Sequence, residues 1–278
     1  MNRIKCLLVV ILFPLLEADA QILVGPVVGG NANTLIFKSR EVRDQYKFSP
    51  ELGYHAGASL SFRVRNRFFL QSSLLYSVRN KTLIENPDNM PYDGDFSNSL
   101  NLKYLEMPIL YTAEFKRKVG KRSDKEFKWY FGVGPTVSYW LGGKGTLSDG
   151  DLFELNIQSL PYKVTFNKSE NAVQRGEMNV QDANRIQLSL NVSAGLIFEP
   201  FGLHKIMVAM RYEHGHSFLS QDSKGYFGGF DGDLYYQDDL QVRLHGIYLS
   251  LHYFVDLKTD QRKKGKSNSK VKQGKSKN

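Results

Sequence analysis

The segment from Gly53 to Val64 alternates between apolar residues and small or polar residues with a period of two. Successive side chains of a β-strand point to opposite faces, so this pattern predicts a strand with one apolar and one polar face. Eight segments show the pattern: Ile22–Asn33, Gly53–Val64, Phe68–Arg79, Leu100–Phe115, Trp129–Leu141, Ile186–Phe198, Ile206–Tyr212 and Ile247–Val255. We therefore expect an all-β protein.

The connections between these segments alternate in length. Those after the first, third, fifth and seventh segments are long, and Gly142–Asn184 is the longest, whereas Arg65–Arg67 and Glu199–His204 are short. Outer-membrane barrels have short periplasmic turns and long extracellular loops. The pattern thus predicts an eight-stranded antiparallel up-and-down transmembrane β-barrel with both termini in the periplasm. Pro135, in the middle of the fifth strand, predicts a bulge or an irregular pairing.

Three regions are expected along the chain. Residues 1–20 resemble a signal peptide, with a basic start, a short apolar run and a small-x-small pattern that predicts cleavage between Ala20 and Gln21. Residues 21–257 would form the barrel. No later stretch is apolar over the roughly 18 residues that a spanning helix needs. The only cysteine, Cys6, precedes the cleavage position, so we expect neither a disulfide nor a thiolate metal site.

The positive charge is concentrated at two places. The net charge is +9, and residues 258–278 hold nine basic residues against Asp260, in a composition typical of a disordered tail. Lys116–Lys128 is a second basic segment. Because the rest of the chain is almost neutral, we expect no nucleic-acid partner. Outer-membrane lipid and an anionic periplasmic partner (an acidic protein, peptidoglycan or phospholipid) are expected instead, although a tail without any partner fits the composition as well.

Six charged residues are predicted to point into the barrel by strand parity: Arg63, Arg79, Arg211, Glu106, Glu114 and Glu213. An eight-stranded barrel is only wide enough for side chains to fill it, and an unpaired buried charge is costly. We therefore expect ion pairs and a plugged, polar lumen. A narrow path for protons or solutes is the alternative interpretation.

An Asp-Gly-Asp sequence occurs in three predicted extracellular loops, at Asp93–Asp95, Asp149–Asp151 and Asp231–Asp233. Each copy is followed directly by an apolar or aromatic residue, such as Phe96 or Leu152. Asp-Gly is a favoured turn sequence, which explains the repeats without a ligand. Carboxylates two residues apart can also bind a hard cation, so calcium binding is a second hypothesis.

His214-Gly215-His216-Ser217 lies at the outer end of the seventh strand. Adjacent strand residues face opposite sides, so His216 and Ser217 are poorly placed as base and nucleophile. His214 and His216 share a face and could hold a metal, but no third ligand is apparent. We favour a polar belt at the membrane interface. Catalysis, as in lipid-modifying barrel enzymes, and metal binding are the weaker alternatives.

Three short motifs resemble the PorT-like outer-membrane β-barrel family of Bacteroidota: Tyr104–Pro108, Phe131–Pro135 and Ser193–Leu196. The resemblance covers roughly residues 21–257. It implies an outer-membrane barrel, and one founding member of that family serves type IX protein secretion. The basic tail extends beyond the usual family pattern.

The sequence contains no motif of a cofactor site. Residues 21–278 have no glycine-rich phosphate loop, no nucleophile elbow and no Cys/His framework. We therefore expect no catalytic residue, cofactor or resident metal. The favoured function is a non-enzymatic, plugged outer-membrane barrel that acts as an anchor or assembly component. A narrow channel or transporter is the first alternative, and a lipid-modifying enzyme is the second.

Overall fold

The computed structural model describes residues 21–85, 96–118, 126–148, 152, 157–169, 172–201, 204–220, 225–227 and 240–257. Eight long strands dominate it: β1 (Ile22–Phe37), β2 (Tyr46–Arg65), β3 (Phe68–Glu85), β4 (Ser97–Lys118), β5 (Glu126–Ser148), β8 (Ile186–Phe201), β9 (His204–Gly215) and β11 (Val242–Asp256). Each pairs with its neighbours in antiparallel fashion. Alternation along the sequence thus located all eight.

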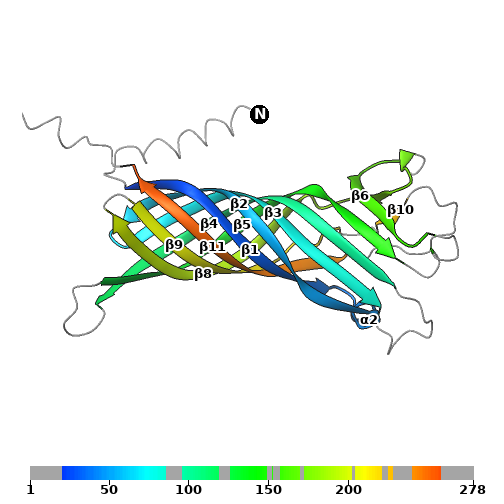
Figure 1. The fold of residues 1–278 in the computed structure, drawn as a ribbon, viewed down its shortest axis with the longest axis horizontal. Helices are drawn as coiled ribbons and strands as arrows, with labels where there is room; N and C mark the ends of the chain where they lie inside the picture. Colours follow the sequence, from blue (N-terminus) through cyan, green and yellow to red (C-terminus); the bar gives the residue numbers. More distant parts are fainter. Residues whose placement is uncertain are drawn as a thin grey trace, which may run out of the picture.

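The eight strands close into a ring. β5 pairs with β8, and β1 pairs with β11 over the whole length of β1, from Leu23↔Asp256 to Phe37↔Val242. Figure 1 shows the ring lying along the long axis of the molecule. Closure leaves no open edge along the body of the ring, as a membrane-spanning sheet requires.

The two ends of the ring differ as the loop lengths predicted. The turn end carries the short connections, such as the two residues Asn66 and Arg67 between β2 and β3. The loop end, at the right of Figure 1, carries a six-residue helix α2 (Arg40–Gln45) and three short strands: β6 (Leu160–Phe166), β7 (Glu177–Val180) and β10 (Tyr226–Phe227). In the described part of the chain, no helix is long and apolar enough to cross a membrane.

The outer and inner faces of the ring follow the predicted parity. Large apolar residues on the outer parity are exposed, for example Leu190 and Leu249, each at 59%. Inner residues are buried and mostly polar, as in the case of Asn191 and Ser193 on β8 and of Ser59 and Ser61 on β2. The apolar outer belt is the surface expected to contact lipid.

The predicted loop Gly142–Asn184 is wrong in its limits. β5 continues to Ser148, and β6 and β7 follow inside the range that was expected to be a loop. β6 pairs antiparallel with β5, and β7 pairs parallel with β6. Alternation marked only the part of β5 with an apolar outer face, because the outer face of a strand need not be apolar once it has left the bilayer.

The expected irregularity at Pro135 takes a milder form than a bulge. The register between β4 and β5 is the same on both sides, from Pro108↔Thr136 to Tyr111↔Val133, with the pairs between them missing. The shift in register lies instead between Lys103 and Tyr104 of β4, opposite Gly142. Gly142 has φ +147°, a backbone conformation that glycine adopts without strain, so the bulge forms there.

Candidate functional site

Four charged side chains meet inside the ring and form the central ion-pair cluster: Arg79 of β3, Glu106 of β4, and Arg211 and Glu213 of β9. Arg79 lies 2.7 Å from a carboxylate oxygen of Glu106 and 2.7 Å from one of Glu213. Arg211 lies 3.4 Å from the second oxygen of Glu106 and 3.7 Å from Glu213. All four residues are buried. Two positive and two negative charges therefore neutralise one another across the lumen.

Two buried tyrosines cover the arginines of this cluster. The Arg79 guanidinium carbon is 4.8 Å from the centre of the Tyr104 ring, and that of Arg211 is 4.2 Å from the centre of the Tyr248 ring. Both tyrosines are fully buried. Cation–π contacts of this kind hold planar guanidinium groups in place, so the cluster and its tyrosines fill the lumen at this level.

Polar side chains continue from the cluster towards the turn end. His55 Nε2 lies 2.8 Å from Ser250 Oγ, and Ser59 Oγ lies 2.7 Å from Ser73 Oγ and 3.0 Å from His252 Nδ1. These residues come from β2, β3 and β11, and all point inward. The half of the lumen towards the turns thus contains a hydrogen-bonded polar network, as the parity of the strands predicted. A second buried apolar cluster lies closer to the turn end and consists of Leu23, Tyr130, Ile197, Met207, Ala209 and Phe254.

The loop end of the lumen is apolar, which corrects the expectation of a polar lumen throughout. We call this region the apolar plug; among its buried members are Leu35, Leu83, Leu100, Leu102, Trp140, Leu147, Leu152, Leu160, Tyr162, Met178, Val180, Leu219, Leu240 and Leu244. They come from the ring, from β6 and β7, and from the segments between strands. Beyond the bilayer the solvent is water, so an apolar interior stabilises this end as it does in a soluble protein.

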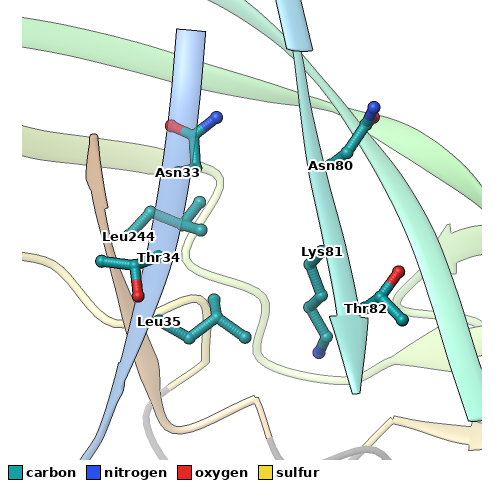
Figure 2. Close-up of a pocket in the computed structure, with 7 residues that line it drawn as sticks. All are labelled: Asn33, Thr34, Leu35, Asn80, Lys81, Thr82 and Leu244. Atoms are coloured by element: carbon teal, nitrogen blue, oxygen red, sulfur yellow. The ribbon is translucent and has the colours of Figure 1, made fainter. Parts of the chain in front are cut away.

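The wall of the ring is also closed where β2 departs from β1. The β1–β2 ladder ends at Asn33↔Glu51, and from there β1 continues beside β3. The gap between them is about 10 Å³, room for a single water molecule. Figure 2 shows Leu35 on β1 and Lys81 on β3 on opposite sides of this gap. No lateral opening of useful size exists at this seam.

The turn end contains a cavity of about 490 Å³, which we call the turn-end vestibule. Its wall comes from seven strands of the ring, from the β2–β3 turn and from Gln21, which directly precedes β1: Gln21, Arg63, Asn66, Arg67, Phe69, Glu114, Phe115, Lys116, Lys128, Glu199, Lys205 and Asp256. Glu199 forms ion pairs with Lys128 and, at 3.4 Å, with Lys205. Asp256 accepts a hydrogen bond from the Gln21 side chain. The vestibule is therefore an open, polar cavity with an excess of positive charge.

A family model decides which class of barrel this is. The model of the outer membrane protein beta-barrel domain matches residues 17–218, well over half of the chain. The chain belongs to this family. The closed ring and the apolar outer belt agree with that membership, and the protein is an integral outer-membrane β-barrel.

Several solved outer-membrane proteins are similar to the chain at very low sequence identity. OprG of Pseudomonas aeruginosa is 11% identical, with 85% of this chain and 94% of that chain covered and a TM-score of 0.42. Neisserial surface protein A is 11% identical over 86% and 97% of the two chains (TM-score 0.35). Ail of Yersinia pestis is 12% identical over 84% and 99% (TM-score 0.32). No curated protein sequence matches the chain.

The barrel gathers four of the six charged residues predicted to pair inside it. Arg63 and Glu114 also face the lumen, where they line the vestibule, but neither forms an ion pair with a described residue, so the prediction of pairing is wrong for these two. Arg63 is exposed and donates to the Asn66 carbonyl oxygen, and Glu114 lines the vestibule. Both lie close to the turn-end termini of their strands, where water reaches the lumen and a charge needs no buried partner.

The His214–Ser217 segment lies on the outside of the barrel. His214 and His216 are both exposed and on the same face, as predicted. The His214 ring packs edge-on against His245 at 4.3 Å, but the described residues contain no group of three side chains suited to a metal. Ser217 Oγ accepts a hydrogen bond from the backbone N–H of Leu188, at 2.9 Å. Its hydroxyl therefore secures the end of β8.

The remaining predicted features fall largely outside the described residues. These are the signal peptide at residues 1–20, the three Asp-Gly-Asp repeats, the tail at residues 258–278 and the middle of the Lys116–Lys128 segment, so all of them stay predictions. Two neighbours of the repeats are described. Phe96 and Leu152, which follow the first two repeats, are both buried in the apolar plug.

Parity could have revealed two features that were missed. Leu100, Leu102 and Tyr104 share the parity of Glu106 on β4. Their side chains therefore indicate that the inner face of β4 becomes apolar towards the loop end. His55 and His252 likewise lie on the inner parity of their strands. The contribution of β6 and β7 to the plug has no such signal, because both strands lie within the range Gly142–Asn184 that the sequence predicts to be a loop.

Proposed function

We propose that this barrel is a non-enzymatic membrane component with a closed lumen, which anchors or assembles other molecules at the outer membrane. The observation that supports the proposal is the double closure of the lumen, by the central ion-pair cluster and by the apolar plug above it. An eight-stranded barrel has room for side chains only, and here side chains occupy that room. Function is then expected at the two ends of the barrel.

Conductance tests this proposal. Purified protein reconstituted into planar lipid bilayers should show no discrete current steps, because ions would have to cross a neutral ion-pair cluster and an apolar plug. A wide porin reconstituted in the same way gives the positive control for insertion. Regular current steps from the barrel, abolished by heat denaturation before reconstitution, would contradict the closed lumen.

A narrow channel or transporter is the second candidate, and one observation favours it. The vestibule opens the turn end, and a polar network that includes His55, Ser59 and His252 lies in the lumen between that end and the central cluster. Such a network has the composition of a proton or solute path. The apolar plug opposes this function, because most of the side chains that fill the lumen beyond the cluster are apolar. The conductance measurement separates the two candidates.

We place the turn end in the periplasm, since short turns face the periplasm in outer-membrane barrels. The vestibule, the basic Lys116–Lys128 segment and the basic tail then lie on the same side of the membrane. This distribution supports an anionic periplasmic partner: an acidic protein, peptidoglycan or phospholipid. The resemblance to PorT-like barrels of Bacteroidota favours type IX secretion or related surface machinery as the assembly.

A truncation tests the role of the tail in that assembly. Affinity purification of the full chain from membranes should recover partners that are lost when residues 258–278 are removed, since the tail carries nine of the basic residues. Folding of both forms can be checked by their heat-modifiable mobility on gels. Identical sets of partners would remove the tail from the proposal.

A further inference from the structure

Among the described residues, one edge of β4 has no strand beside it at the rim of the vestibule. The β3–β4 ladder ends at Phe68↔Ala113, whereas the β4–β5 ladder continues to Lys118↔Glu126. The last contact on the β3 side is a hydrogen bond from the Glu114 N–H to the Arg67 carbonyl, at 2.7 Å. From Phe115 to Lys118, β4 therefore has a described strand on one side only.

The free edge presents hydrogen-bonding groups of the backbone. In an antiparallel strand the N–H and C=O of one residue point to the same side, and alternate residues share that side. The backbone N–H of Glu114 points to the β3 side of β4. The N–H and C=O of Lys116, two residues further on, therefore point to the same side, where β3 has ended and the edge is unpaired. An unpaired strand edge is a template for a further strand.

The surroundings of this edge are cationic. Arg63, Arg67 and Lys116 line the adjacent wall of the vestibule, and no carboxylate among the described residues lies within ion-pair distance of them. Arg67 packs over the Phe115 ring at 5.9 Å, which directs its guanidinium along the rim. Three carboxylates also line the vestibule: Glu114, Glu199, which pairs with Lys128 and Lys205, and Asp256, which accepts a hydrogen bond from Gln21.

The unpaired edge of β4 and the positive charge around it together indicate what kind of ligand would bind there. We propose that the turn-end vestibule binds an extended acidic segment of a partner protein, which adds as a strand to β4 beside Lys116 and places its carboxylates near Arg67 and Lys116. Opposite side chains of paired strands lie about 5 Å apart, within reach of such charge pairs. A second copy of this basic edge would be repelled. The inference deepens the proposed assembly function and rests on it.

The cavity also favours a segment over a single small anion. Its volume of about 490 Å³ falls within the roughly 300–1,000 Å³ of sites for sizeable ligands. A phosphate would contact one part of the wall and leave the backbone groups of Lys116 unpaired. A strand satisfies the backbone and the cations together.

Binding of a model peptide tests the inference on the full chain in nanodiscs of zwitterionic lipid. The probe is a fluorescein-labelled peptide of alternating Glu and Thr, about ten residues long to match a strand, followed by anisotropy. The matched peptide with Gln in place of Glu should not bind. Affinity for the acidic peptide should fall as salt rises, since exposed charge pairs are screened.

Two double variants with the same change of charge locate the site. Arg67→Gln/Lys116→Gln should weaken binding about ten-fold, as expected for the loss of two charge-assisted contacts. Arg65→Gln/Arg117→Gln removes two exposed charges that do not line the vestibule and should change binding by less than about two-fold. An equal loss of peptide affinity in the two variants would overturn the inference. The peptide would then be attracted by the overall positive charge and not by the vestibule.

A proline tests the strand addition itself. Lys116→Pro removes the N–H that faces the free edge and leaves the hydrogen bonds of Phe115 and Arg117 towards β5 available. It should bind the acidic peptide more weakly than Lys116→Gln, which removes only the charge. Equal affinities would contradict strand addition. Gel mobility confirms that each variant is folded.

Competition distinguishes other sources of negative charge. Complete displacement of the peptide by inorganic phosphate at constant ionic strength would show a small-anion site and overturn the inference. Displacement on doping the nanodiscs with anionic phospholipid would show a headgroup site, with the same consequence. Absence of peptide binding by a protein that is silent in conductance would overturn this inference alone and leave the closed lumen intact.

Discussion

At the scale of residues, the central ion-pair cluster shows how a membrane barrel can bury four charges. Each arginine meets two carboxylates, and each lies over a tyrosine ring, so the guanidinium groups have both charge partners and packing. Removing one member leaves the others without compensation in a medium that hydrates them poorly. A single substitution in the cluster should therefore reduce the stability of the barrel more than a double substitution that keeps the charges balanced.

Glu106→Gln should destabilise the barrel by about 3–5 kcal/mol, since two buried arginines would then share one carboxylate. Glu114→Gln makes the same change on the same strand at the hydrated vestibule and should cost less than about 1 kcal/mol. Urea unfolding in detergent, followed by tryptophan fluorescence, measures both. The double variant Glu106→Gln/Arg211→Gln restores neutrality and should be more stable than Glu106→Gln; a further loss would contradict the charge argument.

Parity alone predicted which charges enter the lumen, and it succeeded for Arg79, Glu106, Arg211 and Glu213. It also placed Arg63 and Glu114 on the inner face, but it could not show that they lie unpaired at the vestibule, because parity gives the face of a strand and not the depth of a residue along it. The distances that link β3, β4 and β9 depend on the register of three ladders, which no local pattern encodes.

At the scale of elements, β5 combines two environments in one strand. Its first part presents exposed outer residues such as Phe131 and Val133 to the membrane, and its last part buries Leu147 in the apolar plug. The change of environment coincides with the bulge opposite Gly142. Alternation therefore ended near Leu141, although the strand runs on to Ser148.

Leu147→Ala should destabilise the barrel by about 2–5 kcal/mol, because a fully buried side chain leaves a cavity in the plug. Leu141→Ala is the matched change on the exposed face of the same strand, and we expect a cost below about 1 kcal/mol. Unfolding midpoints in detergent micelles compare the two variants. Equal costs would show that the plug is not a cooperative part of the barrel.

At the scale of the whole molecule, the two ends of the barrel differ in structure and in charge. One end is closed by the plug, and the other opens into a cationic cavity into which every strand sends at least one residue or its direct neighbour. The alternation of loop lengths predicted which end is which, without any knowledge of the plug. Strand number and order could be predicted because both depend on repeated local patterns.

The orientation can be measured in cells. An epitope inserted after Asp182, an exposed turn residue at the loop end, should be cleaved by external protease in intact cells. An epitope following residue 278 should resist cleavage until the outer membrane is permeabilised, since β11 ends at the turn end. The opposite pattern would invert the barrel and move the vestibule to the cell surface.

The seam between β1 and β11 has a consequence for how the barrel is made. The backbone N–H of Leu257 donates to the Ile22 carbonyl oxygen at 2.8 Å, so the first and last strands are joined although the whole barrel lies between them in sequence. Pairing of such distant segments carries a large entropic cost and is slow. Until β11 pairs with it, β1 keeps an open edge, so that edge must be protected until the ring closes.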